Sequence, residues 1–370
     1  MRLNNNQRAF FALVRAGLWE TEVRLSQFKE IDYNEVCRLA EEQSVTGLVA
    51  AGLEHVADVK VPQEVALIFV GSALQLEQQN LAMNEFVANL IDQLRAKDVY
   101  ALLVKGQGIA QCYERPLWRA SGDVDLLLSE DNYRRAKDLL LPQAVNAEQE
   151  YSTFKHLGMT MKGGFVVELH GALYTRLSKR IDSGIDALQH DLFCGGNVRS
   201  WENGYTHVFL PGADVDAIFV FTHILHHFYV EGIGLRQICD WCRLLWTYRE
   251  TLDRALLERR LRAMGLMSEW QAFAALAVDW LGMPAEAMPL YSVLRRWSRK
   301  GNSIMKFVLE CGNFGHNRQK TRAKSFLGGK VASVWRKMRD FGRHARVFPL
   351  DSVKFFFHFV GDGIRLASEQ

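Results

Sequence analysis

Residues 99–128 read VYALLVKGQGIAQCYERPLWRASGDVDLLL, two apolar runs joined by a polar connection that contains glycines. The run 99–106 is rich in β-branched, aromatic and aliphatic residues and ends at glycine, which predicts a buried strand. A helix is expected over about 107–114, a second strand over 123–128 and a second helix over 131–141. This strand–helix–strand–helix order predicts a small α/β core.

The segments around this core extend the sheet and then cover it with helices. Runs 155–162 and 165–171 flank Gly163-Gly164, a pair that can supply the positive φ angles of a hairpin turn. Run 206–212 predicts a last strand. Helical periodicity is present over 34–56 and 62–97 before the core, and in four segments between 213 and 282 after it. The predicted fold class is α+β, a small mixed sheet flanked by N-terminal and C-terminal helical regions.

This pattern divides the chain into four segments. Residues 1–97 form an N-terminal helical region, 98–211 the α/β core, 212–290 a helical domain, and 291–370 a basic, aromatic-rich C-terminal region. From residue 301 onward no single periodicity holds. The four-segment division follows from these changes in pattern.

Composition excludes several classes of protein. The chain has 370 residues, of which 48% are hydrophobic, enough to form real cores and to exclude general disorder. Its six cysteines are too few for a disulfide framework, and the start MRLNNNQRAFF lacks the order of a signal peptide. No run approaches the roughly 20 apolar residues of a membrane-spanning helix. We expect a cytoplasmic protein, with peripheral attachment at the inner face of the membrane as an option.

Charge is distributed unevenly along the chain. The formal net charge is +3, but residues 291–370 carry 17 Lys+Arg against five Asp+Glu and the rest of the chain is acidic. Basic and aromatic residues are interleaved in this C-terminal region, which suits an anionic membrane surface or, less well, nucleic acid. The alternative is an ordinary helical subdomain with a solvated positive face. A polyanionic partner is therefore one of three interpretations.

Three acidic side chains are the candidate catalytic residues. Asp123 and Asp125 lie two apart in a predicted strand, so their side chains project from the same face. Glu168 lies in another predicted strand and joins that face if the two strands are neighbours. Such a set suits one or two Mg²⁺ ions together with substrate phosphate. The alternative is a solvated edge or turn, although Leu126–Leu128 indicates a central strand.

Residues beside these carboxylates could bind phosphate. Lys105 and Gly106 stand where the first strand meets its helix, and a helix N-terminus with a lysine can hold a triphosphate. The glycines there could equally be turn residues. Arg119 has the geometry for bidentate phosphate binding, or could instead pair with Asp123 or Asp125. Dinucleotide-binding and P-loop sequences are absent.

A histidine-rich helix follows the core. His223, His226 and His227 are spaced three and four residues apart, so they share one face. A zinc site is one interpretation, and packing or hydrogen bonding is another. We expect His226, Arg236 and Asp240 to form one buried polar cluster that binds the acceptor or joins the domains.

The ordered combination of these motifs resembles the family of uncharacterised nucleotidyltransferases, within the DNA polymerase β-like superfamily. The matching positions over roughly 96–250 are Lys105-Gly106, Tyr113, Pro116, Arg119, Gly122 to Leu127, Glu168 to His170, His223, His226, Arg236 and Asp240. The wider superfamily places Gly-Ser where Lys105-Gly106 stands here, so phosphate handling could differ. Members are often linked with bacterial polysaccharide or peptide biosynthesis.

The resemblance implies that Asp123, Asp125 and Glu168 are metal-binding catalytic carboxylates and that a nucleoside triphosphate (NTP) is the donor. It places Lys105, Gly106, Arg119 and Gly122 at the nucleotide. The residues assigned to an acceptor site or domain interface are His170, His223, His226, Arg236 and Asp240.

The predicted activity is Mg²⁺-dependent transfer of NMP from NTP to an undetermined acceptor, in polysaccharide or envelope biosynthesis. Two alternatives stay open. One is a catalytically inactive nucleotide-binding scaffold, and the other is a membrane-surface accessory protein that acts through residues 291–370.

Overall fold

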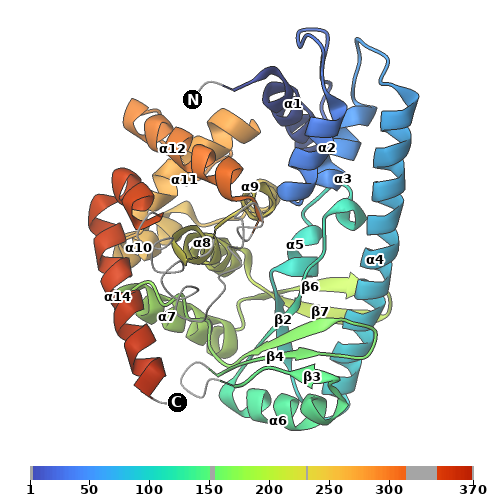
Figure 1. The fold of residues 1–370 in the computed structure, drawn as a ribbon. Helices are drawn as coiled ribbons and strands as arrows, with labels where there is room; N and C mark the ends of the chain where they lie inside the picture. Colours follow the sequence, from blue (N-terminus) through green and yellow to red (C-terminus); the bar gives the residue numbers. More distant parts are fainter. Residues whose placement is uncertain (1–2, 151–154, 231, 314–339, 369–370) are drawn as a thin grey trace, which may run out of the picture.

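The computed structural model describes residues 3–150, 155–230, 232–313 and 340–368. Four helices come first, and Figure 1 shows the last and longest running down one side of the molecule. They are α1 (Asn5–Trp19), α2 (Tyr33–Glu42), α3 (Thr46–Glu54) and α4 (Gln63–Arg95). The single helix predicted over 34–56 is divided, because Ser44 has a φ of +54° and the neighbouring Gln43 side chain accepts from the backbone N–H of Leu235.

The main sheet has mixed pairing, as predicted, and five strands, of which the short β3 was not predicted. Its strands are β1 (Ala101–Val104), β2 (Val124–Leu128), β3 (Asn146–Ala147), β4 (His156–Thr160) and β5 (Val166–His170), in the order β1-β2-β5-β4-β3. Strands β2 and β5 are parallel and the other pairs are antiparallel. The short helices α5 (Gly106–Ala110) and η1 (Pro116–Trp118) join β1 to β2, and α6 (Glu130–Leu140) and η2 (Leu141–Gln143) follow β2.

The predicted hairpin is confirmed at β4 and β5. Gly163 and Gly164 both have positive φ angles, +89° and +83°, a region open to glycine at little steric cost. The turn is closed by the Met161 N–H, which donates to the Phe165 carbonyl at 2.8 Å. This turn fixes which residues of the two strands lie opposite each other.

The strand predicted over 206–212 forms, but in a separate sheet. It is β7 (Thr206–Pro211), paired with β6 (Val198–Asn203) in a two-stranded ribbon outside the five-stranded sheet. Neither β6 nor the preceding helix α7 (Lys179–Gly195) was predicted from the sequence. The residues of β6 alternate only between exposed and partly exposed. The strand therefore lacks the run of buried apolar residues that would have predicted it from the sequence.

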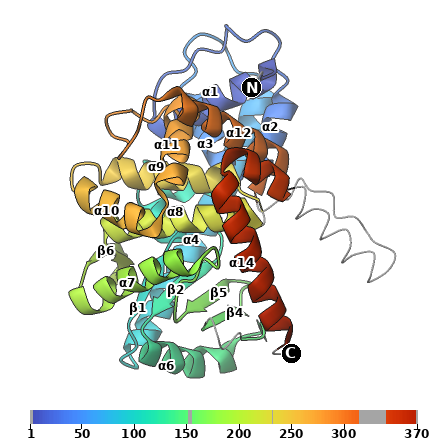
Figure 2. The same cartoon turned by 90° about the vertical axis from the view of Figure 1, so that its left-hand side faces the viewer.

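The described residues after β7 are mainly helical, and the four helices predicted between 213 and 282 are confirmed. They are α8 (Ala213–Val230), α9 (Leu235–Thr247), α10 (Arg254–Met264) and α11 (Met267–Leu281). Then come α12 (Arg295–Cys311) and α14 (Pro349–Ser368), which runs from the helical half toward the end of the molecule that carries the sheet (Figures 1 and 2). Much of the predicted basic region, 314–339, lies outside the described residues. None of the helices in the described parts is long and apolar enough to cross a membrane.

Two apolar clusters make up the core. One joins the N-terminal helices to α8–α12 and α14, and the other lies between the sheet, α4 and α6. Helix α4 belongs to both, through Phe69 and Ala73 in the first and Val87, Leu90 and Leu94 in the second. A single helix of 33 residues therefore ties the sheet to the helical body.

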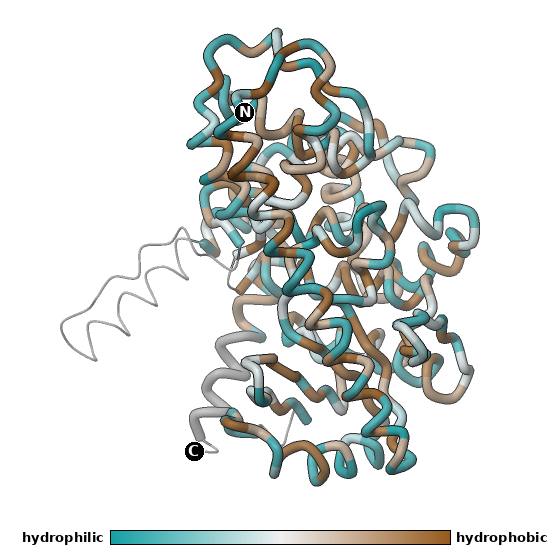
Figure 3. The backbone as a smooth tube through the Cα atoms, turned by 90° about the vertical axis from the view of Figure 1, so that its right-hand side faces the viewer, coloured by the Kyte–Doolittle hydropathy of each residue, from teal (hydrophilic) through white to brown (hydrophobic). Residues whose placement is uncertain are grey.

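The outer face of α4 is exposed and contains apolar residues. Figure 3 faces this side of the molecule. Leu67, Leu74 and Leu81 follow one another at seven-residue spacing and are all exposed. The helix carries no basic residue before Arg95.

One buried carboxyl group lies where α14 meets the helical body. Glu269 of α11 is fully buried, and the Tyr229 hydroxyl donates to its Oε1 at 3.5 Å. Burial, followed by the negative charge of Asp351 on α14, raises the pKa of Glu269 to about 8. The group is therefore mostly protonated at neutral pH.

The raised pKa of Glu269 predicts that the free energy of unfolding decreases as pH rises. A carboxyl whose pKa is higher in the folded than in the unfolded protein binds an extra proton when folded, so stability is lost as pH rises from about 4.5 to about 8. The variant Glu269→Gln keeps the shape without the charge. We expect its free energy of unfolding to exceed that of the wild type by about 1–3 kcal/mol at pH 8, and to match it near pH 5. Urea unfolding at both pH values tests this. An equal increase in the free energy of unfolding at pH 5 and pH 8 would contradict it.

Candidate functional site

The three predicted carboxylates come together in the structure. Asp125 of β2 and Glu168 of β5 are register partners on adjacent parallel strands, so their side chains leave the sheet on the same face. Asp123 lies two residues earlier, immediately before β2. All three line one cavity of about 600 Å³. The sequence predicted that the three carboxylates would share one face if their two strands were neighbours. Strands β2 and β5 are neighbours in the sheet, so this prediction is confirmed.

The carboxylates repel one another. Burial raises the pKa of Asp123, and the negative charges of Glu168 and Asp125 raise it further, against the opposing effect of Lys105 and Arg236. The arrangement therefore favours positive charge in the cavity.

Lys105 supplies part of that charge. Its Nζ lies 2.8 Å from Oδ1 of Asp125. Burial alone would lower the pKa of Lys105, but the charges of Asp125 and Glu168 outweigh it and raise the pKa. The backbone at Lys105 has a φ of +60°, a conformation that costs a non-glycine residue of order 1–3 kcal/mol. This strained turn directs the lysine toward the carboxylates.

Two glycines lie close to the same turn. Gly106 has a φ of +41°, and a Cβ there would lie 3.2 Å from the carbonyl oxygen of Asp123. Gly122 lies beside Arg236, whose Nη1 would be 3.8 Å from a Cβ at that position. Helix α5 has only five residues, whereas the sequence predicted a helix over about 107–114. The dipole at its N-terminus is therefore weaker than expected. Both glycines line the cavity.

Arg119 forms its ion pair with neither Asp123 nor Asp125, the two partners considered from the sequence. Its Nε donates to Oδ1 of Asp240 at 2.9 Å and its Nη2 to Oδ2 at 2.8 Å, while Nη1 donates to the Ala120 carbonyl. The Tyr113 hydroxyl also donates to Asp240, at 2.8 Å. The pairing considered with Asp123 or Asp125 is thus corrected to Asp240, and Arg119 also lines the carboxylate cavity.

The residues of the predicted cluster of His226, Arg236 and Asp240 line two adjoining cavities. Arg236 lines the carboxylate cavity with Asp240, and its Nη1 donates to the Ala120 and Ser121 carbonyls at 3.2 Å. His226 instead lines an adjoining cavity, where its Nδ1 lies 2.7 Å from the Thr175 carbonyl oxygen. The three residues therefore belong to two cavities.

The adjoining cavity has a volume of about 410 Å³ and is rich in histidine. It shares Lys105, Glu168, His223 and His227 with the carboxylate cavity. His223 and His227 face each other with 3.0 Å between their Nε2 atoms. Burial, and then the charge of Lys105, holds the pKa of His223 well below its usual range, so that ring is neutral at pH 7.

Two more histidines lie directly on the carboxylates. His170, assigned from the sequence to an acceptor site or domain interface, lies with its Nε2 2.9 Å from Oδ1 of Asp125 and 3.5 Å from Oε2 of Glu168. His156, which the sequence did not single out, has its Nε2 3.3 Å from the same Glu168 oxygen. Working out the register of the predicted hairpin could have identified His156, because it lies directly opposite His170.

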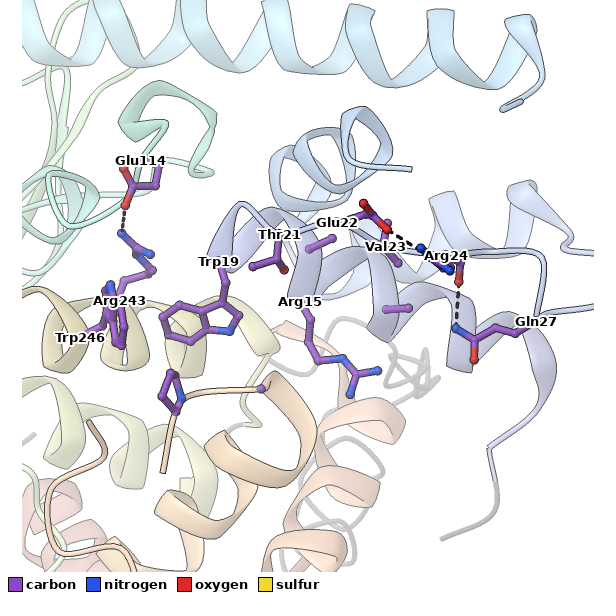
Figure 4. A pocket seen from close by; sticks show the side chains of 14 residues that line it. Arg15, Trp19, Thr21, Glu22, Val23, Arg24, Gln27, Glu114, Arg243 and Trp246 are labelled. Atoms are coloured by element: carbon purple, nitrogen blue, oxygen red, sulfur yellow. Dashed lines mark hydrogen bonds and ion pairs between the residues drawn. The ribbon is translucent and has the colours of Figure 1, made fainter. Parts of the chain in front are cut away.

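A separate cavity of about 600 Å³ lies against α1 and α9, with Trp19 and Trp246 on its wall (Figure 4). Four of its charged side chains form two pairs, Arg243 with Glu114 at 2.9 Å and Arg24 with Glu22 at 3.1 Å. None of the three candidate carboxylates lines it. The cavity beside β2 and β5 is therefore the better candidate for chemistry.

A family model described as "Uncharacterised nucleotidyltransferase" matches residues 29–282. The chain belongs to this family. The match includes all the candidate site residues named above, from Lys105 to Asp240, and extends through the N-terminal helices α2–α4. No curated protein and no solved structure matches the chain significantly.

The buried ion pair of Arg119 and Asp240 gives a stability prediction. In Asp240→Asn the Arg119 charge stays buried without its counter-ion, which typically costs about 3–5 kcal/mol. The surface pair of Arg262 and Glu258, 2.6 Å apart on α10, provides the control. Glu258→Gln should change the free energy of unfolding by less than about 0.5 kcal/mol. Denaturant unfolding of both variants tests this, and similar losses would contradict it.

Proposed function

We propose that the protein transfers NMP from an NTP to an acceptor in a Mg²⁺-dependent reaction. The observation that carries the proposal is the register pairing of Asp125 with Glu168, which places two carboxylates and the adjacent Asp123 on one wall of a cavity. The nucleotidyltransferase family to which the chain belongs supports the same chemistry. The acceptor is undetermined, and envelope or polysaccharide biosynthesis is the proposed setting.

The donor set fits Mg²⁺. Carboxylate oxygens are the ligands this ion prefers, and the mutual repulsion that raises the pKa of Asp123 is relieved by a cation. Asp123, Asp125 and Glu168 would hold one or two ions, which when bound offset charge on the transferred phosphate and lower the pKa of the attacking group. The cavity is large enough for a triphosphate beside them.

The cationic side chains of the cavity would orient the triphosphate. Lys105 borders both cavities and Arg236 lies beside Gly122, so we assign phosphate contact to Lys105 and Arg236. Gly106 and Gly122 would let the substrate approach the backbone. Arg119 would hold Asp240 and the turn that leads into β2.

Glu168 is better suited to hold an ion than to remove a proton. Burial alone would raise the pKa of Glu168, but hydrogen bonding to His156 and His170 outweighs it and lowers the pKa well below its usual value. A carboxylate of low pKa is a weak general base. The acceptor would enter from the histidine-rich cavity, which meets the first at Glu168.

The double variant Asp123→Asn, Asp125→Asn tests this proposal. We expect transfer of label from α-³²P-NTP into a mixed acceptor extract to fall by at least about 10³-fold, because the charge that would hold the metal is lost. Calorimetry should show loss of Mg²⁺-dependent binding of a non-hydrolysable NTP analogue. The control is Asp131→Asn, an exposed carboxylate on α6 that pairs with Arg134.

Undiminished transfer and NTP binding in the folded double variant would overturn the proposal. NTP binding by the wild type without pyrophosphate release in any acceptor pool would instead identify an inactive scaffold.

We further propose that the C-terminal region contacts an anionic membrane surface. Leu350, Val353 and Phe357 of α14 are exposed on the turns of one helix, at spacings of three and four residues, next to the exposed Lys354. The basic excess of residues 291–370 favours anionic lipid over neutral lipid.

Vesicle co-sedimentation tests the membrane contact. We expect binding to phosphatidylserine-containing vesicles, and about tenfold weaker binding when Leu350, Val353 and Phe357 are changed to Ser. The matched control changes Leu67, Leu74 and Leu81 of α4 to Ser, because these are equally exposed and apolar but lie on an acidic helix. Equal loss in both variants, or no binding by the wild type, would contradict the contact.

A further inference from the structure

One face of the β4–β5 hairpin carries two histidines and a glutamate. His156 and His170 are register partners on the antiparallel strands, and Glu168 precedes His170 by two residues on the same face. Gly158 lies opposite Glu168, so no side chain of β4 covers the carboxylate there.

The ligand atoms of this trio converge. Both histidines present Nε2 to the same oxygen of Glu168, at 3.3 Å and 3.5 Å, and all three atoms lie within 4.8 Å of one another. Tetrahedral ligands that each lie about 2.0–2.1 Å from a shared ion are separated by about 3.3 Å, which is close to the two histidine–glutamate separations.

The site is accessible. The side chains of His156 and Glu168 are 31% and 28% exposed, and all three residues line the histidine-rich cavity. An ion could therefore reach the three atoms without rearrangement of the sheet.

We propose that His156, Glu168 and His170 bind a divalent first-row transition-metal ion. Two imidazoles and one carboxylate are donors typical of zinc and its neighbours, whereas Mg²⁺ prefers oxygen ligands throughout. The Oδ1 atom of Asp125 is 2.9 Å from Nε2 of His170 and is a further carboxylate oxygen close to the trio.

The new site adjoins the carboxylate site and shares Glu168 with it. If the proposed function holds, the chain carries two unlike metal sites, one formed by carboxylates and one containing histidines, joined by a common glutamate. Metal binding by the trio requires no nucleotide and can be measured on its own.

The test uses the full chain without a histidine tag, stripped of metal by a chelator. Co²⁺ is the probe, because its visible d–d absorption reports nitrogen ligation. We expect one Co²⁺ ion per chain to bind the wild type at least about 100-fold more tightly than it binds His156→Gln. Loss of even one residue that only supports a metal ligand typically lowers metal affinity 10–100-fold. Competition should rank Zn²⁺ above Mn²⁺, and both above Mg²⁺.

His156→Gln keeps a hydrogen-bond donor toward Glu168, and circular dichroism checks its fold. The matched control is His190→Gln, an exposed histidine on α7 that lines neither cavity. Equal Co²⁺ affinity and spectra for wild type and His156→Gln would overturn the proposal and show that the imidazoles only form ion pairs. Such a result would leave the NMP transfer unaffected, because the Asp123→Asn, Asp125→Asn variant is tested with Mg²⁺ and NTP.

Discussion

Repulsion between carboxylates is the constraint on which this structure depends. Asp125 and Glu168 face the same way from adjacent strands, and Asp123 adds a third negative charge within the same cavity. Like charges this close and partly buried are unfavourable unless cations or donors surround them. Lys105 is held by a strained backbone to meet Asp125, and the imidazoles of His156 and His170 meet Glu168. A bound cation would relieve the same repulsion.

The fold serves to bring β2 and β5 side by side. Parallel neighbours cannot be joined by a tight turn, and here the connection runs through α6, β3 and β4 before β5 returns beside β2. Strand β4 is thereby placed next to β5, which puts His156 opposite His170. Helix α4 packs against this sheet at one end and against the helical body at the other. The helix α8, which carries His223, can then form the second wall of the cavity.

Features encoded by neighbouring residues could be predicted from the sequence, and features that need long-range contacts could not. The strands around Asp125 and Glu168, the glycine turn and the four later helices follow from local patterns. The pairing of Arg119 with Asp240 joins residues 121 positions apart, so Asp123 and Asp125 were the obvious but wrong partners. His156 gains its place only from strand register. The break at Ser44 depends on contacts with α9 and α12 that the sequence around it does not reveal.

The two cavities differ in charge, and this difference bears on how a transfer reaction could be arranged. The carboxylate cavity contains Arg236 and the paired Arg119, whereas the adjoining one has one arginine, Arg176, and five histidines, of which His223 is neutral at pH 7. A triphosphate carries several negative charges and is favoured where guanidinium groups lie. The adjoining cavity, with fewer charged side chains on its wall, would suit an acceptor with less charge. Under the proposed function the two substrates would therefore meet at Lys105 and Glu168, the charged side chains that both cavities share.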